Sequence, residues 1–195
     1  MFEPRSALAA FAPPGGGPAL AGEADLQLAE LRGWQLAQLT AWRSSRDAFR
    51  WLLGEQLQAA PPEPLYRGVS HGPSRLVRLT PDQYWWVTND GAALERLQAA
   101  LTPALGAFTA LTDARVRIAV SGPAARELLA AGIALDLHPA VFVVGQSAQT
   151  GLHHTGVFLE RVAADSYELF VPRTFAATIW EFLLDAALPF GVKPA

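Results

Sequence analysis

Apolar and polar residues in the first half of the chain follow one period and then another. The apolar residues between Leu31 and Leu39 predict a strand. The next apolar residues recur at helical spacing, which predicts a helix with one buried face made of Phe49, Leu52, Leu53 and Leu57. Ser44 or Ser45 is placed to cap the first turn of that helix, and Asp47 suits its positive end.

A proline-rich segment separates this helix from the next elements. Residues 60–74 are expected to form a loop, because closely spaced prolines remove backbone donors. Two strands, 75–79 and 83–88, then flank a Thr80-Pro81-Asp82 turn and predict a hairpin. Asn89 or Asp90 is expected to cap the helix that follows. The apolar face of that helix consists of Leu94, Leu97 and Leu101.

The second half of the chain shows the same succession of patterns. Val116, Ile118 and Val120 alternate with polar residues, as in a half-buried strand. Gly132 is expected to end the short helix of this half. The predicted elements, in order, are a strand at 114–120, a short helix after Ser121-Gly122-Pro123, a hairpin of strands 156–162 and 166–171, and a helix at 174–188.

Both halves therefore read β-α-β-β-α, which indicates an internal duplication. Ala48-Phe49-Arg50-Trp51-Leu52-Leu53 resembles Ala124-Ala125-Arg126-Glu127-Leu128-Leu129 at the equivalent place. Asp82-Gln83-Tyr84 likewise resembles Asp165-Ser166-Tyr167. We predict an α+β fold in which duplicated β-α-β-β-α units pack together. Residues 26–195 would form one domain of two similar halves, about 26–105 and 106–195, after a flexible leader rich in Ala, Pro and Gly at 1–25.

Composition narrows the class of protein. The chain has 195 residues with a net charge of -3 and scattered Lys and Arg, which argues against nucleic-acid binding. It contains no Cys, which excludes disulfides and thiolate chemistry and fits a reducing cytoplasm. The sequence has no long uncharged apolar run of the kind that would predict a membrane span. Charged residues make up only 17%, so the chain has little polar cover for its surface.

A series of short motifs in a fixed order resembles the gamma subunits of heterotetrameric sarcosine oxidases, from about Leu31 to Leu188. The C-terminal part, Tyr167 to Ala176 followed by Trp180, carries the strongest resemblance. The earlier motifs are Leu79-Thr80-Pro81-Asp82 with Trp85-Trp86, Ser121-Gly122-Pro123-Ala124-Ala125, Asp136-Leu137-His138-Pro139 and Gly145-Gln146-Ser147-Ala148-Gln149-Thr150.

The resemblance implies a fold related to the folate-binding domain of the glycine-cleavage T protein. It also implies a subunit without a cofactor of its own, assembled with alpha, beta and delta subunits. Those partners are expected to hold FAD, FMN, NAD, zinc and folate. The chain would then be a non-catalytic structural subunit of an oxidase that converts sarcosine to glycine and hydrogen peroxide, linked to one-carbon transfer to tetrahydrofolate. When produced alone, it could form a homo-oligomer.

The residues themselves offer no catalytic or metal-binding constellation. The histidines, His71, His138, His153 and His154, lack the spacing of a metal motif. On a strand, the neighbours His153 and His154 would point to opposite faces. Ser121 is expected to cap a helix, because Val120 before it leaves no room for a nucleophile turn. Of the acids considered, Asp82, Asp113, Asp136 and Glu160, none matches a folate site, and Asp82 is interpreted as a turn former.

The last predicted helix suggests a protein interface. Its polar residues, Thr174, Thr178, Glu181 and Asp185, form one narrow stripe. The apolar remainder is wider than packing on one sheet requires, so the helix is either enclosed by its own domain or docks another subunit. Aromatic residues favour docking. The candidate interface residues are Trp180, Trp85, Phe175 and Leu184.

Two other functions remain open. The chain could be a stand-alone folate-binding protein of the T-protein type, or a scaffold subunit of another amine oxidase. Copurification with a flavoprotein would favour a subunit, whereas tetrahydrofolate binding by a monomer would favour the stand-alone protein.

Overall fold

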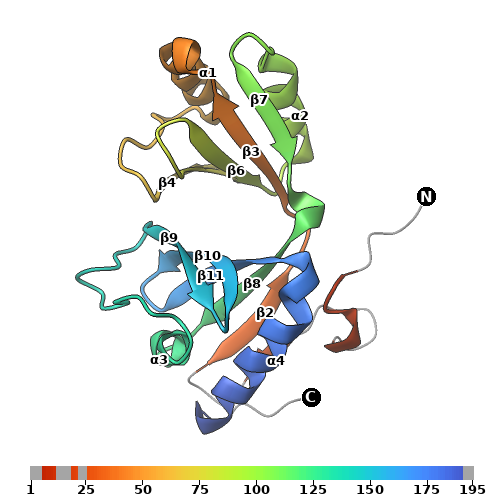
Figure 1. Cartoon of the computed structure of the whole chain (residues 1–195), viewed down its shortest axis with the longest axis vertical. Coiled ribbons are helices and arrows are strands. Elements are labelled where there is room, and N and C mark those ends of the chain that lie inside the picture. The colour runs from red at the N-terminus through yellow and green to blue at the C-terminus, as the bar shows by residue number, and fades with distance from the viewer. Residues whose placement is uncertain (1–5, 12–18, 22–25, 191–195) are drawn as a thin grey trace. The chain divides into compact units, whose positions relative to one another are not determined.

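The computed structural model describes residues 6–11, 19–21 and 26–190 and divides into two compact units (Figure 1). The terminal unit comprises residues 1–32 and 114–195, and the central unit comprises residues 33–113. The predicted α+β class is confirmed, because each unit combines an antiparallel sheet with helices.

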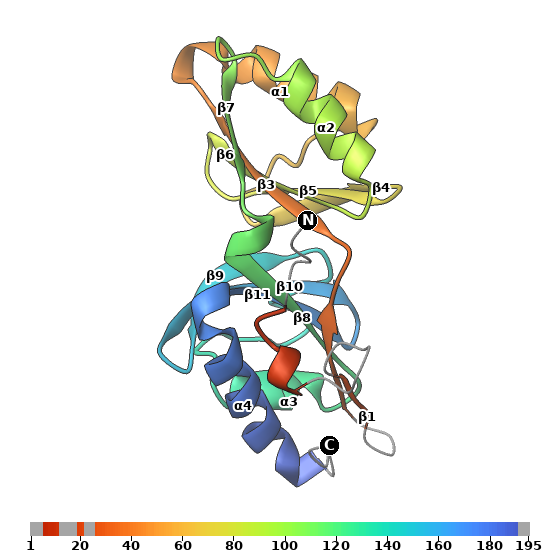
Figure 2. The same ribbon diagram turned by 90° about the vertical axis from the view of Figure 1, so that its right-hand side faces the viewer.

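The central unit is a sheet covered by two helices on one face (Figure 2). Its strands lie in the order β4-β5-β6-β3-β7. Tyr84 and Trp86 of β6 point to the helix side, where they pack with Phe49 of α1 and Leu97 of α2. The bounds are β3 Gln35–Ala41, α1 Arg46–Leu57, β4 Arg67–His71, β5 Ser74–Arg78, β6 Gln83–Thr88, α2 Gly91–Ala100 and β7 Gly106–Ala110.

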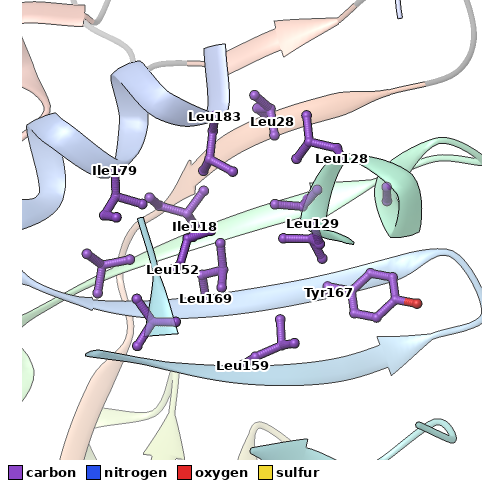
Figure 3. Packing of buried hydrophobic residues seen from close by; sticks show 14 of the residues in the cluster. Leu28, Ile118, Leu128, Leu129, Leu152, Leu159, Tyr167, Leu169, Ile179 and Leu183 are labelled. Atoms are coloured by element: carbon purple, nitrogen blue, oxygen red, sulfur yellow. The ribbon is translucent and has the colours of Figure 1, made fainter. Parts of the chain in front are cut away.

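The terminal unit has a six-stranded sheet in the order β1-β2-β8-β11-β10-β9. Helices α3 and α4 pack on one face of it, and Figure 3 shows the apolar side chains gathered between helices and sheet. Ile118, Leu169 and Leu159 come from the sheet, and Ile179 and Leu183 come from α4. The bounds are β1 Ala19–Ala21, β2 Gln27–Leu31, β8 Arg115–Ser121, α3 Ala125–Ala130, β9 Ser147–Leu152, β10 Thr155–Ala163, β11 Ser166–Pro172 and α4 Ala176–Ala187.

The two sheets repeat the same order of strands with one exchange along the chain. The central order β4-β5-β6-β3-β7 corresponds to the terminal order β9-β10-β11-β8-β2. In sequence, β2-β3-α1-β4-β5-β6-α2 corresponds to β7-β8-α3-β9-β10-β11-α4. Each stretch therefore gives its first strand to the sheet of the other stretch, since β2 pairs with β8 and β7 pairs with β3. For this reason the compact units are cut differently from the stretches 26–105 and 106–195.

Strands β1, β4, β7 and β9 escaped the sequence patterns. The expected loop at 60–74 is wrong in its second part, because β4 occupies Arg67–His71. Strands β7 and β9 were not predicted either. The predicted strand at 31–39 belongs to two strands, β2 and β3, separated at Gly33, whose φ of 71° suits glycine. Strands β4, β7 and β9 lie at sheet edges, where a single neighbour supplies the pairing and apolar alternation is not required.

Some expected helix caps are also wrong. Ser45 precedes α1, but its hydroxyl donates to the carbonyls of Leu105 and Trp42 and caps no helix amide. Ser121 ends β8, where it pairs with Ser166, and α3 begins later without a side-chain cap. Gly132 has no positive φ and so does not supply a left-handed ending. Asp90 caps α2 as predicted, accepting the amide of Ala92 at 3.0 Å.

Part of the expected flexible leader is structured. Leu8 is fully buried in the terminal core, and the Ser6 hydroxyl donates to the carboxylate of Glu30 on β2. Residues 9–11 form a short 3-10 helix, and β1 adds an edge strand beside β2. The rest of the predicted leader, residues 1–5, 12–18 and 22–25, lies outside the described residues. The described segments therefore complete the terminal unit.

Candidate subunit interface

Trp180 of α4 is a core residue of the terminal unit. Its side chain is 1% exposed and packs in the same cluster as Ile179 and Leu183. The prediction that Trp180 anchors a partner is therefore wrong. The alternative, a helix enclosed by its own domain, describes this part of α4.

The apolar flanks of α4 are covered from within the terminal unit. On one flank, Phe182 stacks on the ring of His153, with 4.8 Å between the ring centroids and 24° between the planes. On the other, Figures 1 and 2 agree in placing the 3-10 helix Ala9–Phe11 beside α4. Leu184 is half-buried against the same core that contains Leu8. The width of the apolar surface on α4 thus reflects enclosure on three sides.

Trp85 is also inaccessible. It alternates with Tyr84 and Trp86 along β6, so it lies on the face of the central sheet away from α1 and α2. Its side chain is 3% exposed, and its indole N–H lies 3.4 Å from Oε1 of Gln38 on the neighbouring strand. Trp85 and Trp86 thus lie on opposite faces of the sheet, and both side chains are buried.

Phe175 is accessible. It lies in the 3-10 turn Arg173–Phe175 that precedes α4, and its side chain is 49% exposed. Leu188, just after the other end of α4, is similarly exposed. The assignment of Phe175 to an interface stays a prediction.

The central unit exposes tryptophans that the sequence patterns did not single out. Trp51 on α1 is 68% exposed and Trp42 before α1 is 45% exposed. The Trp42 indole N–H donates to the carbonyl of Pro103 at 2.7 Å, which fixes that ring on its own unit. Trp51 is therefore the more accessible apolar side chain of α1. Its place off the Phe49, Leu52 and Leu53 face was the signal in the sequence.

Ion pairs border α1. Arg46 binds both carboxylate oxygens of Asp82 in the β5–β6 turn, and Arg50 pairs with Glu63. The hydrogen bond from Arg46 holds the pKa of Asp82 below its ordinary value. In the turn, Thr80 accepts the amides of Asp82 and Gln83, so Asp82 joins the hairpin to the helix in addition to its place in the turn.

An ion pair also crosses the terminal sheet. Arg117 of β8 donates to both oxygens of Glu168 on β11, each at 2.9 Å, and lies 5.6 Å from the ring centre of Phe170. Strand alternation places this pair on the face away from α3 and α4, since Val116 and Ile118 point into the core. The bidentate geometry fixes the register of the two strands.

The histidines occupy structural positions. His153 and His154 form the two-residue turn between β9 and β10, and both have positive φ, 43° and 64°, so they do not lie on a strand. The His138 ring accepts the amide of Ala140, and Asp136 accepts the amide of His138. Within the described ranges, no cluster of three or more His, Asp or Glu side chains is arranged to hold a metal ion. None of the described helices is long and apolar enough to cross a membrane.

The model of the GCVT N-terminal domain family matches residues 69–195. The chain belongs to this family. The match begins inside the first repeated stretch and runs through the whole second one. It therefore includes β5 and β6 of the central unit and the hairpin of β10 and β11 in the terminal unit.

Individual relatives agree with this family and extend the likeness. The sarcosine oxidase subunit gamma of Corynebacterium sp. strain P-1 is 32% identical over 117 residues, which are 60% of this chain and 58% of the relative. The matched region thus spans less than two thirds of that relative. A chain of the heterotetrameric sarcosine oxidase from Corynebacterium sp. U-96 superposes with a TM-score of 0.84 at 25% identity, covering 98% of both chains.

The glycine cleavage system aminomethyltransferase T from Bartonella henselae shares the fold. It superposes with a TM-score of 0.64 at 19% identity, covering 83% of this chain and 46% of the aminomethyltransferase. The predicted resemblance to sarcosine oxidase gamma subunits and to the T-protein fold is therefore confirmed.

Proposed function

We propose that this chain is a non-catalytic structural subunit of a heterotetrameric sarcosine oxidase. The observation that carries the proposal is the superposition on a chain of such an oxidase over 98% of both chains. The sequence identity of 32% to a sarcosine oxidase gamma subunit supports the same assignment.

The structural roles of the candidate reactive residues support a non-catalytic chain. Ser121 lies within a strand that is paired on both sides, and the ring of His153 stacks on Phe182. Asp82 is committed to its ion pair with Arg46. These side chains hold the fold together, so the chemistry of the complex would belong to its other subunits.

Alpha, beta and delta subunits would be the partners, in the cytoplasm. They would hold the FAD, FMN, NAD, zinc and folate that sarcosine oxidation and one-carbon transfer require. The oxidation removes two electrons and two protons from the methyl C–H and the N–H of sarcosine and passes them to oxygen as hydrogen peroxide. Water then releases glycine and the one-carbon unit, which tetrahydrofolate accepts. This chain would contribute surface for assembly.

Copurification tests the proposal. The tagged chain is produced together with the other oxidase subunits encoded by its own source, and the captured material is examined for flavin absorbance and sarcosine-dependent peroxide. We expect a flavin-containing complex that oxidises sarcosine, and no peroxide from the chain purified alone. A tagged chain that captures no flavoprotein under these conditions contradicts the proposal.

The family match favours one alternative, a stand-alone protein that binds tetrahydrofolate. Titration calorimetry with tetrahydrofolate on the chain alone separates the two functions. We expect no measurable heat of binding from the isolated chain. A dissociation constant in the micromolar range, with a monomer that captures no flavoprotein, would replace the subunit assignment with the folate-binding one.

A further inference from the structure

Helix α1 presents an unusual residue to solvent. The side that packs on the central sheet carries the buried residues Phe49, Leu52, Leu53 and Leu57. Trp51 lies off that side and is 68% exposed, the most accessible of the large apolar residues among those described. The packing of the central unit therefore does not require an indole at this position.

The duplicated helix α3 shows what the fold itself requires there. Its segment Ala124–Leu129 matches Ala48–Leu53, so Leu52 and Leu53 correspond to Leu128 and Leu129. All four leucines are buried, each pair in the core of its own unit. The position that corresponds to Trp51 is Glu127, which is exposed. The same site in the repeat thus carries an ordinary surface residue.

Acidic residues flank the indole along the helix. Asp47 lies four residues before Trp51 and Glu55 lies four residues after it, so the three side chains follow one line on α1. All three are exposed. Within the described ranges, neither Asp47 nor Glu55 forms an ion pair.

The nearby cations of α1 are already engaged. Arg46 is bound to Asp82 and Arg50 is bound to Glu63, so their positive charges are matched inside the central unit. The line Asp47, Trp51 and Glu55 therefore presents an apolar centre between two carboxylates that form no ion pair within the described residues. The complementary surface is an apolar socket rimmed by Lys or Arg side chains.

We propose that this line, which we name the α1 ridge, docks a partner subunit of the oxidase through such a cation-rimmed socket. The proposal rests on the proposed function. Tryptophan side chains are enriched among the residues that dominate binding energy at the centre of interfaces, and charges around them set the association rate and its salt dependence. The indole would supply most of the affinity, and the two carboxylates would orient the encounter.

Assembly of Trp51→Gln tests the role of the indole. Glutamine is a good helix former and avoids a third acid beside Asp47 and Glu55, so the chain should melt at the same temperature as the wild type. We expect the concentration for half-maximal capture of flavin-containing subunits to rise by about 30-fold or more, since an interface hot spot contributes at least that factor. Trp51→Phe should recover part of the loss. Glu127→Gln, at the matched position of α3, should assemble like the wild type.

The double variant Asp47→Lys with Glu55→Lys tests the charge of the socket. We expect slower association with the flavin-containing subunits at low salt, and an association rate that rises with added salt where that of the wild type falls. An unchanged salt dependence would overturn the cation-rimmed socket.

Three outcomes separate the hypotheses. Trp51→Gln assembling as tightly as the wild type overturns the α1 ridge and leaves the proposed function standing. If light scattering shows that the chain alone dimerises and that Trp51→Gln abolishes only this dimer, the occupant is a second copy and the proposal is overturned. If the wild-type chain captures no flavoprotein, the proposed function fails and the ridge assignment fails with it.

Discussion

Helices α1 and α4 have the same length, 12 residues, and each carries one tryptophan, yet they use it in opposite ways. Trp180 on the mostly apolar α4 is 1% exposed, whereas Trp51 on the more polar α1 is 68% exposed. Helix α4 is enclosed by the sheet of the terminal unit, by the N-terminal segment that contains Leu8, and by His153. Apolar packing holds α1 on one side only, with ion pairs to Asp82 and Glu63 at its borders. A wide apolar surface on a helix can therefore reflect enclosure within its own unit, and the accessible tryptophan is the one on the more polar helix.

The largest effect expected from this comparison follows replacement of the buried indole. Trp180→Ala should lower the free energy of unfolding by about 3 to 5 kcal/mol, because it leaves a large cavity in the terminal core. Trp51→Ala, its matched control, should change it by less than about 0.5 kcal/mol. Urea denaturation of the chain alone measures both. Equal losses in the two variants would contradict the contrast between the helices.

The N-terminal cover of α4 should contribute a somewhat smaller amount. Leu8 is fully buried, so Leu8→Ala should cost about 2 to 4 kcal/mol of unfolding free energy. Ala9→Ser, at a half-buried position of the same segment, serves as the control and should have little effect. Thermal melting followed by circular dichroism compares them. A Leu8→Ala chain as stable as the wild type would show that α4 does not depend on this segment.

The second exposed tryptophan of the central unit allows a finer comparison. Trp42→Phe removes the indole N–H that donates to Pro103, which should cost about 1 kcal/mol. Trp51→Phe should leave the unfolding free energy unchanged, because no hydrogen bond of its indole contributes to the described fold. Guanidinium denaturation distinguishes them, and a neutral Trp42→Phe would mean that water replaces the lost bond.

The smallest effect concerns acid pH and α1. Because the pKa of Asp82 is lowered in the folded chain, its pairing with Arg46 contributes stability above the unfolded pKa of about 3.9. That contribution is lost as the pH falls through the lower folded pKa. The melting temperature of the wild type should therefore fall more steeply below about pH 4 than that of Asp82→Asn. Parallel curves for the two chains would remove Asp82 from the acid response.

Most of the fold class could be predicted from the sequence, because the decisive signals are local. The spacing of Phe49, Leu52 and Leu53 identified the buried side of α1. The Thr80-Pro81-Asp82 turn identified the hairpin of β5 and β6. The exposed position of Trp51 was readable from the same spacing. The assignment of Trp180 to an interface failed for a physical reason. An apolar residue is expected to be buried, but its hydrophobicity does not show whether its own domain or a partner covers it.

The sequence by itself determined the α+β class, the internal repetition and the side that each helix buries, since these depend on patterns among residues within a few positions of one another. Tertiary structure alone decided the exchange of β2 and β7 between the sheets, because strand pairing joins segments that lie far apart in the chain. It also decided which tryptophan is buried. Trp180 lies in a core to which Leu8, more than 170 residues away in sequence, also contributes, and no local pattern shows that two such distant segments share one core.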